Sequence, residues 1–231
     1  MKIGLLSDAH GNPSGLENCL AFLERQEVDR IFFLGDAIGY LPRWAAVLEL
    51  LKTRDIFCLR GNHDARLFAN NAPLDLSDAY QIFPEYIQSI LSYRSWIETW
   101  PSWHSISVGG KKLLFVHGSP MNPTEGYVYP WSMKDEFRNV DADVIFMGHT
   151  HRPFVESFEG KVLVNVGSCG LPRDHGALSA CAIYDTDKAA CEIFRVPFNI
   201  EEVIAASPSI HPSVEQCLHR TCVDFVGKLI G

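Results

Sequence analysis

Five apolar, strand-like runs in this chain each end in a short segment that carries aspartate, asparagine or histidine. The runs read IGLLSD, IFFLGD, IFCLRGNHD, KLLFVHG and VIFMGHTH, and their polar ends are Asp8–His10, Gly35–Asp36, Gly61–Asp64, His117–Gly118 and Gly148–His151. Parallel α/β sheets place ligand sites at the carboxyl ends of their strands. We therefore expect these five segments, which lie far apart in the sequence, to meet in one pocket.

The composition is typical of a globular protein of moderate size. The chain has 231 residues, of which 47% are hydrophobic and 21% charged, and this length suits one large domain or two small ones. The formal net charge of −8 argues against polymeric nucleic acid or an anionic membrane as a partner, because both require a basic face. A small phosphorylated substrate is still compatible with that charge, since bound divalent cations reverse the local field.

Cysteine usage and the first residues indicate the cytoplasm. The chain has 7 cysteines, scattered over mostly apolar surroundings, and an odd, scattered set is not a disulfide framework. Met1 leads directly into a predicted strand, which leaves no room for a signal peptide. No apolar run approaches the length of a membrane span. We therefore expect free thiols in a reducing compartment.

The first sixty residues alternate between strand-like and helix-like patterns. The expected elements, in chain order, are a strand at Ile3–Ser7, a helix at Ser14–Glu27, a strand at Ile31–Leu34, a helix at Pro42–Leu51 and a strand at Asp55–Leu59. Ser14 and Glu17 have the spacing of a capping box at the start of the first helix. This alternation predicts parallel βαβ units.

The segment from about residue 65 to 103 interrupts this alternation. It is helical in character and rich in tyrosine and tryptophan. We interpret it as a helical insert that covers a sheet edge, because aromatic side chains most often belong to a core. The alternative is a cap that shapes the mouth of the pocket or pairs two subunits in a homo-oligomer.

The second half of the chain has the pattern of antiparallel hairpins. The predicted hairpins join Ser105–Val108 to Lys111–Val116, Pro153–Phe158 to Lys161–Val166, and Leu178–Tyr184 to Ala190–Val196. The Gly109-Gly110 pair supports the tight primed turn that such hairpins need. We expect a short helix at Met133–Phe137, a buried strand at Val144–Met147 and a helical tail over about 199–231. One domain over residues 1–231, with two packed sheets and outer helices, is the simplest organisation.

The donor types at the five strand ends favour a transition metal. Imidazole nitrogen together with carboxylate or amide oxygen suits Mn²⁺, Fe, Zn²⁺, Ni²⁺ or Co²⁺, whereas Ca²⁺ and Mg²⁺ prefer oxygen alone. His149 and His151 are two residues apart. In an extended segment they lie on one side and are far enough apart to serve two metals.

Taken in order, D-x-H, GD, GNHD, HG and GHTH resemble the calcineurin-like metallophosphoesterases, and most closely their small bacterial and archaeal phosphodiesterase branch. The resemblance runs from Lys2 to about Pro197 and includes the segments HGNPSGLE, GDAIGY, HGSP and NVGSCGLPRD. It implies an α/β fold: a four-layer α-β-β-α sandwich of two mixed sheets flanked by helices. A dinuclear metal site would lie at the carboxyl ends of the strands.

The resemblance also implies two sets of metal ligands that share one bridging carboxylate, Asp36. The first set is Asp8, His10 and His151, and the second is Asn62, His117 and His149. The cofactors would be two divalent transition-metal ions, with manganese favoured and iron, zinc, nickel or cobalt as alternatives. Every ligand position of the family is filled by an expected residue type.

His63 is not among the implied ligands. The resemblance gives it the role of donating a proton to the leaving oxygen of a small phosphoester, or of stabilising the charge that develops there. Asp64 would orient the His63 ring, as carboxylates commonly do for imidazoles. Two metals can share a water and lower its pKa, and the resulting bridging hydroxide would attack phosphorus.

The implied activity is hydrolysis of a small phosphodiester. One alternative is a phosphomonoesterase or dinucleoside-polyphosphate hydrolase that uses the same site. Another is a non-catalytic scaffold, as in a retromer subunit of this fold that has lost the catalytic histidine. The presence of His63 favours an enzyme.

Several further residues near the motifs have open roles. Three arginines could bind substrate phosphate or lie on an ordinary surface, a tyrosine could stack on a base or pack at the rim, and two asparagines could support the ligands or cap local turns. They are Arg60, Arg152, Arg173, Tyr40, Asn12 and Asn165. We expect specificity to reside in the insert and in the loops Ala37–Pro42 and Ser119–Pro130.

Overall fold

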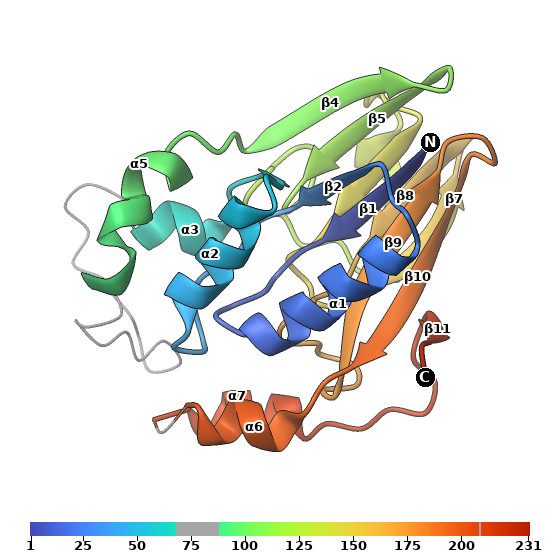
Figure 1. Cartoon of the computed structure of the whole chain (residues 1–231). Coiled ribbons are helices and arrows are strands. Elements are labelled where there is room, and N and C mark those ends of the chain that lie inside the picture. Colours follow the sequence, from blue (N-terminus) through green and yellow to red (C-terminus); the bar gives the residue numbers. More distant parts are fainter. Residues whose placement is uncertain (68–87, 208) are drawn as a thin grey trace.

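The structure, a computed structural model, describes residues 1–67, 88–207 and 209–231. Two β-sheets pack face to face in it (Figure 1). The strands of the first sheet are, in spatial order, β11 (Lys228–Leu229), β10 (Ala190–Pro197), β9 (Leu178–Asp185), β1 (Lys2–Leu6), β2 (Arg30–Phe33) and β3 (Phe57–Cys58). Those of the second sheet are β4 (Trp103–Val108), β5 (Lys111–Val116), β6 (Val144–Met147), β8 (Lys161–Asn165) and β7 (Phe154–Phe158).

Both sheets are mixed, as predicted. In the first sheet, β1, β2 and β3 run parallel, while β9 pairs antiparallel with both β1 and β10. In the second, β5, β6 and β8 run parallel and are flanked by the antiparallel strands β4 and β7. The three predicted hairpins are therefore confirmed. Gly109 and Gly110 both have positive φ, at 58° and 72°, which is the backbone that a type I′ turn requires.

The main core lies between the two sheets. Ile3 and Leu5 of β1 and Phe32 of β2 are fully buried against Phe115 of β5 and Phe146 of β6. Successive side chains of a strand point to opposite faces, so the intervening strand positions pack on the outer layers. This two-sided burial explains why the strands before the polar segments are apolar without alternation.

Helices α1 (Pro13–Arg25) and α2 (Trp44–Thr53) cover the outer face of the first sheet (Figure 1). The capping box predicted at Ser14 is wrong. Asn12 is the N-cap, and its side-chain oxygen accepts a hydrogen bond from the Gly15 N–H at 3.1 Å. Pro13 occupies the first turn of α1, where its fixed φ suits a helix and its missing N–H costs nothing.

The outer face of the second sheet is covered by the segment 118–142. Val128 and Phe137 of this segment pack against Ile145 and Met147 of β6. The short helix predicted here is a single 3₁₀ turn, η2 (Asp135–Phe137).

Part of the aromatic insert lies outside the described residues, namely positions 68–87. The described flanks contain α3 (Asn62–Leu67), the 3₁₀ turn η1 (Leu91–Tyr93) and α5 (Arg94–Ile97). Ile90, Ile97 and Trp100 are buried in the core cluster that contains α1 and α2. This half of the insert therefore packs onto the fold. Trp103, which we placed in the insert, is instead the first residue of β4.

The helical prediction for the tail is correct only for its first half. Helices α6 (Ile200–Ala205) and α7 (Pro212–Leu218) are present, but the chain then forms β11, which pairs parallel with β10. Gly227 has a φ of 113°, which no helix accommodates. The apolar spacing that suggested a helical tail combined Val214 and Leu218 of α7 with Leu229 of β11.

Among the described residues, no helix is long and apolar enough to cross a membrane.

Candidate metal centre

All five polar segments meet at one edge of the sandwich, beyond the carboxyl ends of β1, β2, β3, β5 and β6. The seven expected ligands and His63 lie close together there, each within 3.9 Å of another member of the set. In the described part of the chain, three groups of side chains at this edge could hold a metal ion. The first cluster is Asp8, His10 and His151, and the second is Asp36, His117 and His149. The third group takes His10 and Asp36 from these clusters and adds His63. The convergence that the sequence predicted is therefore present in the structure.

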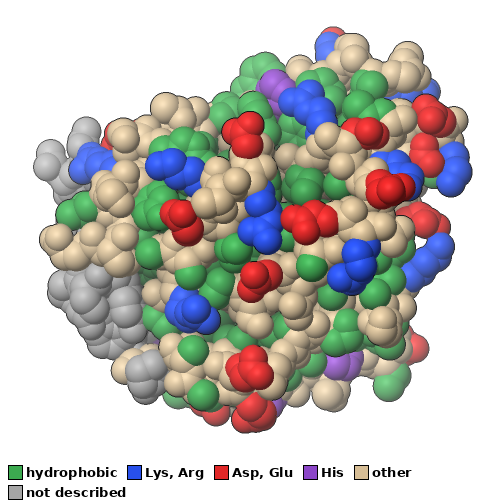
Figure 2. Space-filling view, in the orientation of Figure 1, with side chains coloured by type: hydrophobic (Ala, Val, Ile, Leu, Met, Phe, Trp, Pro, Cys, Tyr) green, Lys and Arg blue, Asp and Glu red, His purple; other side chains and the backbone are tan. Residues whose placement is uncertain are grey.

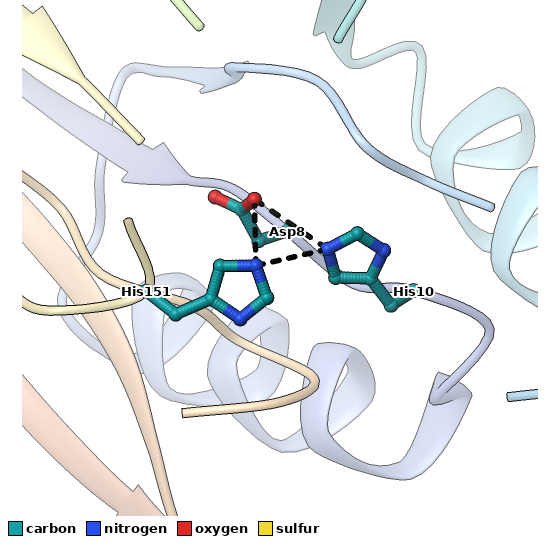
Figure 3. Close-up of side chains that lie close together, drawn as sticks. All are labelled: Asp8, His10 and His151. Atoms are coloured by element: carbon teal, nitrogen blue, oxygen red, sulfur yellow. Dashed lines mark hydrogen bonds and ion pairs between the residues drawn. The ribbon is translucent and has the colours of Figure 1, made fainter. Parts of the chain in front are cut away.

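In the first cluster, the side chains of Asp8, His10 and His151 point toward one another (Figure 3). Backbone contacts fix the protonation of its histidines: the Nδ1 of His10 lies 2.9 Å from the carbonyl oxygen of Ile38, and that of His151 lies 2.6 Å from the carbonyl oxygen of Leu171. A carbonyl only accepts, so each Nδ1 carries a proton. In a neutral ring, Nε2 is then a bare lone pair. The two Nε2 atoms nevertheless face each other at 3.0 Å.

Asp8 completes this cluster. Its Oδ1 lies 3.2 Å from Nε2 of His151 and 3.6 Å from Nε2 of His10. Its Oδ2 accepts a hydrogen bond from the His149 N–H at 3.0 Å, which fixes the orientation of the carboxylate. Three acceptor atoms thus converge on one buried position, where they repel one another unless a cation lies between them.

The second cluster repeats this arrangement. Nδ1 of His117 donates to the Leu34 carbonyl oxygen at 2.9 Å. Its Nε2 lies 3.1 Å from Nδ1 of His149, 3.2 Å from Oδ1 of Asn62 and 3.3 Å from Oδ2 of Asp36. Histidines that bind metals in proteins usually donate their second ring N–H to such a carbonyl or carboxylate.

Asp36 lies between the two clusters. Its Oδ2 is 3.3 Å from Nε2 of His117 and 3.6 Å from Nε2 of His10, so a single oxygen reaches both sets. Its Oδ1 accepts the His63 backbone N–H at 2.9 Å. This geometry is the one that a bridging carboxylate needs.

Divalent metal ions fit these donors. Asp8 Oδ1 is a buried polar atom without a hydrogen-bond partner among the described residues, although native proteins pair nearly all such atoms. The mixture of imidazole nitrogen with carboxylate and amide oxygen matches first-row transition metals. The residues would hold such ions at the two clusters, with Asp36 in common.

The electrostatics of the centre agree with cation binding. Burial opposes ionisation of Asp8, but His151 and His117 favour it and hold the pKa of Asp8 well below its usual value. Burial lowers the pKa of His149 to about 4, with His117 acting in the same direction. The pKa of His117 is about 9, because Asp36 and Asp8 outweigh the effect of burial. A metal ion that binds His117 therefore displaces a proton.

Five of the expected ligands have a left-handed backbone. These residues and their φ angles are Asp8 (57°), His10 (45°), Asp36 (60°), His149 (64°) and His151 (58°). Such conformations are uncommon outside glycine and store strain of about 1–3 kcal/mol each, mostly at functional sites. The residue types do not predict this strain, because aspartate and histidine also occur in ordinary backbone.

Two glycines allow the close packing of the ligand loops. A Cβ at Gly61 would lie 2.1 Å from Oδ1 of Asp36, and one at Gly148 would lie 2.1 Å from Oγ of Ser7 and 2.7 Å from Oδ2 of Asp8. Any larger residue at either position would displace a carboxylate of the centre.

His63 lies at the edge of the centre, on α3. Its ring centroid is 4.7 Å from that of His10 and 5.0 Å from that of Tyr40, and its Nε2 is 3.9 Å from Oδ2 of Asp36. Burial lowers the pKa of His63 to about 3 against the opposing effect of Asp36, with neighbouring histidines lowering it further. The position suits a group that contacts substrate bound beside the metals; its role as a proton donor is still a prediction.

Asp64 contacts the loop that carries Asp36. Its Oδ2 accepts the N–H groups of Asp36 at 2.7 Å and Gly61 at 3.0 Å, and its Oδ1 accepts the N–H of Ala37 at 3.1 Å. These bonds fix the loop that carries Asp36 and the turn before the His63 helix. The predicted orientation of the His63 ring by Asp64 is still a prediction.

The structure also places the residues whose roles were open. The Nη2 of Arg173 donates to the hydroxyl of Tyr40 at 3.1 Å, and the Tyr40 ring lies 4.6 Å from the His10 ring. Asn165 donates to the Gly148 carbonyl oxygen at 2.6 Å. It therefore supports the loop that follows β6 and carries His149 and His151.

The other three open residues are Asn12, Arg60 and Arg152. Asn12 caps α1 and also donates to the Gly170 carbonyl oxygen at 2.8 Å. Arg60 and Arg152 are half-buried. Tyr127, which we did not single out, lies against the metal-site histidine His149, with ring centroids 4.0 Å apart.

The fold and site define a metal-binding α/β protein with a cluster of aspartate and histidine at the strand ends. The family model of the calcineurin-like phosphoesterase superfamily domain matches residues 1–189, and the chain belongs to this superfamily. The family supports a metal-dependent phosphoester hydrolase.

Three relatives show how far the similarity extends. The uncharacterized protein MJ0912 of Methanocaldococcus jannaschii is 31% identical over 221 residues, covering 87% of this chain and 89% of its own. A metallophosphoesterase from Sphaerobacter thermophilus is 26% identical with a TM-score of 0.77, covering 94% of this chain and 98% of its own. The hypothetical protein PH1004 from Pyrococcus horikoshii OT3 shares the fold, with a TM-score of 0.80, 18% identity, and coverage of 95% and 98%.

Proposed function

We propose that this protein hydrolyses a small phosphodiester at a centre of two divalent metal ions, with His63 as proton donor to the leaving oxygen. The observation that carries the proposal is the pair of converging clusters. His10 and His151 in the first cluster and His117 in the second donate from Nδ1 to a backbone carbonyl and present the other nitrogen to a carboxylate. Manganese is the favoured metal for this donor set, with iron, zinc, nickel and cobalt as alternatives.

When bound, the two ions would supply an activated water and neutralise charge on the phosphoryl oxygens. The residues of the chain then have separate tasks. Asp36 spans the two clusters, and Asp64 holds its loop through the N–H groups of Asp36 and Ala37. Because these carboxylates are fixed before substrate arrives, little reorganisation is needed in the transition state.

His63 would hold the proton that the leaving oxygen needs. Its neutral ring carries one N–H, and an approaching phosphate anion favours the protonated form because opposite charges raise the pKa of a histidine. General acid catalysis of this kind contributes about 10²- to 10⁴-fold. His63→Ala should therefore lose about that factor in turnover while it retains metal.

A small substrate agrees with the charge of the molecule. The net charge is −8, and on the face that carries α1 and α2 the acidic and basic side chains are interspersed (Figure 2). A polymeric nucleic acid would require a basic track.

An assay of three esters with added Mn²⁺ tests the proposal: bis-p-nitrophenyl phosphate, p-nitrophenyl phosphate and diadenosine tetraphosphate. We expect the fastest hydrolysis with the diester, and loss of it in His63→Ala but not in the exposed control His219→Ala. A preference for the monoester would make the protein a phosphomonoesterase, and a preference for the tetraphosphate would make it a dinucleoside-polyphosphate hydrolase. Full turnover by His63→Ala would remove His63 from the mechanism, and inactive protein that Mn²⁺ cannot restore would favour a scaffold.

A further inference from the structure

Three aromatic side chains lead outward from the metal centre along residues 127–131. The ring of Tyr127 lies against His149, with centroids 4.0 Å apart. The centroids of the Tyr127 and Tyr129 rings are 6.1 Å apart, and their planes differ by 10°. The centroids of the Tyr129 and Trp131 rings are 5.1 Å apart, and their planes differ by 5°. Trp131 lies in a turn in which the Ser132 N–H donates to the Tyr129 carbonyl oxygen at 3.0 Å. We call Tyr127, Tyr129 and Trp131 the aromatic ladder.

The ladder is largely exposed. Tyr127 is 56% exposed and Trp131 72%, and beside them Met133 is 86% exposed. Large aromatic side chains usually lie in a core, and a contiguous exposed apolar patch marks a binding surface. Since the ladder starts on a metal-site histidine, this surface is continuous with the candidate active site.

The backbone under the ladder is held in place. Val128, between the two tyrosines, is buried in the core on the outer face of the second sheet. Lys134 is buried, and its Nζ donates to the carbonyl oxygens of Pro130 and Ser132, each at 2.8 Å. A buried lysine needs such partners to offset its loss of hydration, and here they are two backbone oxygens beside the ladder together with Oε2 of Glu156, which lies 3.2 Å from Nζ.

The near end of the ladder is fastened to the catalytic side of the fold. Glu125 accepts two hydrogen bonds from Nη2 of Arg66, at 2.9 and 2.8 Å, and Arg66 belongs to α3, the helix of His63. A surface that is ordered in advance loses less conformational entropy when a ligand binds.

We propose that the aromatic ladder is a stacking subsite for the base of a nucleotide whose phosphate lies at the metal centre. This inference rests on the proposed function, because it takes the metal centre as the phosphate site. A nucleotide joins a phosphate to a planar aromatic group, and these are the two chemistries that the centre and the ladder present side by side. Aromatic side chains stack on any base without reading its edge.

The ladder favours a mononucleotide or dinucleotide ester over a nucleic-acid strand. Residues 119–133 contain no lysine or arginine and one glutamate, Glu125. Proteins that bind single strands combine their stacking aromatics with a positively charged groove that follows the backbone. The ladder offers the stacking surface without that charge, so each bound molecule should extend only a short way from the metals.

Direct binding of two probes that differ only in the base tests the ladder. Adenosine 5′-monophosphate and ribose 5-phosphate are titrated calorimetrically into the full chain with Mn²⁺. In the native protein the nucleotide should bind about 5- to 150-fold more tightly. Tyr129→Leu/Trp131→Leu, which keeps apolar bulk without a ring, should bring this ratio close to one. Trp131→Phe, which keeps a ring, should retain most of it.

A ratio near one in the native protein, or a ratio unchanged in the double leucine variant, would overturn the inference. So would dissociation of an oligomer by that variant with the ratio intact, because the ladder would then be a subunit interface. Hydrolysis of bis-p-nitrophenyl phosphate is measured in parallel. Turnover without a base preference would refute only the ladder, whereas a base preference without turnover would refute only the proposed function.

Discussion

Two buried groups of charged side chains differ in how their polar atoms are satisfied. Arg195 of β10 is fully buried, and its guanidinium donates to both carboxylate oxygens of Asp174, to the Leu178 carbonyl oxygen and to the Val226 carbonyl oxygen. It also lies 5.4 Å from the centre of the Phe225 ring. In the metal centre, by contrast, acceptor atoms face other acceptors, and Asp8 Oδ1 has no partner among the described residues.

The difference distinguishes a buried charged group that stabilises the fold from one that is suited to bind a ligand. The Arg195 group is complete within the chain, and it fastens the C-terminal segment to the first sheet. In the metal centre, the histidines are held in place by Nδ1 or by a backbone N–H. The ring nitrogens that face each other across the first cluster then have no donor, and a cation would satisfy them. Buried charge alone therefore does not indicate a functional site, whereas several buried acceptors that converge on one position do.

Breaking the satisfied pair should give the largest loss of stability. Arg195→Met leaves the Asp174 carboxylate buried without its partner, which typically costs about 3–5 kcal/mol in the free energy of unfolding. Urea unfolding measures this loss. The exposed pair Arg94–Glu98 (Nε–Oε1 2.8 Å) is the matched control, because removing an exposed ion pair by Glu98→Gln should cost at most about 1 kcal/mol.

The folded fraction of Arg195→Met should still hydrolyse phosphoesters, since the pair does not belong to the metal centre. An equal loss of stability in Arg195→Met and Glu98→Gln would show that the buried Arg195 group stabilises the fold no more than an exposed ion pair does.

Adding metal should stabilise the protein by a smaller amount. A ligand at 100 times its Kd stabilises the native state by about 2.7 kcal/mol, which for a chain of this size corresponds to a rise in Tm of about 5–11 °C. Calorimetry with and without Mn²⁺ measures the rise. It should vanish in Asp36→Asn and persist in Arg195→Met; persistence in Asp36→Asn would place the metal elsewhere.

The smallest effect concerns the loop between β1 and α1. Asn12→Ala removes the cap of α1 and the bond to the Gly170 carbonyl oxygen, at a cost of about 0.5–2 kcal/mol. Ser14→Ala should be close to neutral, because Ser14 is not the cap. Chemical denaturation of the two variants side by side separates the observed cap from the predicted one, and a larger loss in Ser14→Ala would favour the capping box.

The sequence predicted the strand ends and the donor residues because both carry strong side-chain patterns. Apolar runs marked the strands, and the polar residues that end them marked the site. The sequence could not predict the contacts made by backbone atoms. The carbonyl groups of Ile38, Leu34 and Leu171, which fix the histidine tautomers, belong to residues with ordinary apolar side chains.

Two other features show where the patterns misled or were overlooked. Val214 and Leu218 belong to α7, but Leu229, which shares their apparent helical spacing, belongs to β11. Helical spacing over long gaps is weak information, and pairing with β10 decided the structure. The alternation of aromatics at Tyr127, Tyr129 and Trp131 was visible in the sequence as period two, which is the sign of a strand, but the structure has no strand there and Trp131 lies in a turn.

The central claim is that the converging acceptors form a site for two metal ions. Elemental analysis of the full chain, after dialysis against Mn²⁺ and removal of free metal, tests it most directly. We predict two equivalents of metal per chain, and a loss of bound metal in Asp36→Asn but not in His219→Ala. Fewer than two equivalents in the native protein, or undiminished binding in Asp36→Asn, would contradict the claim.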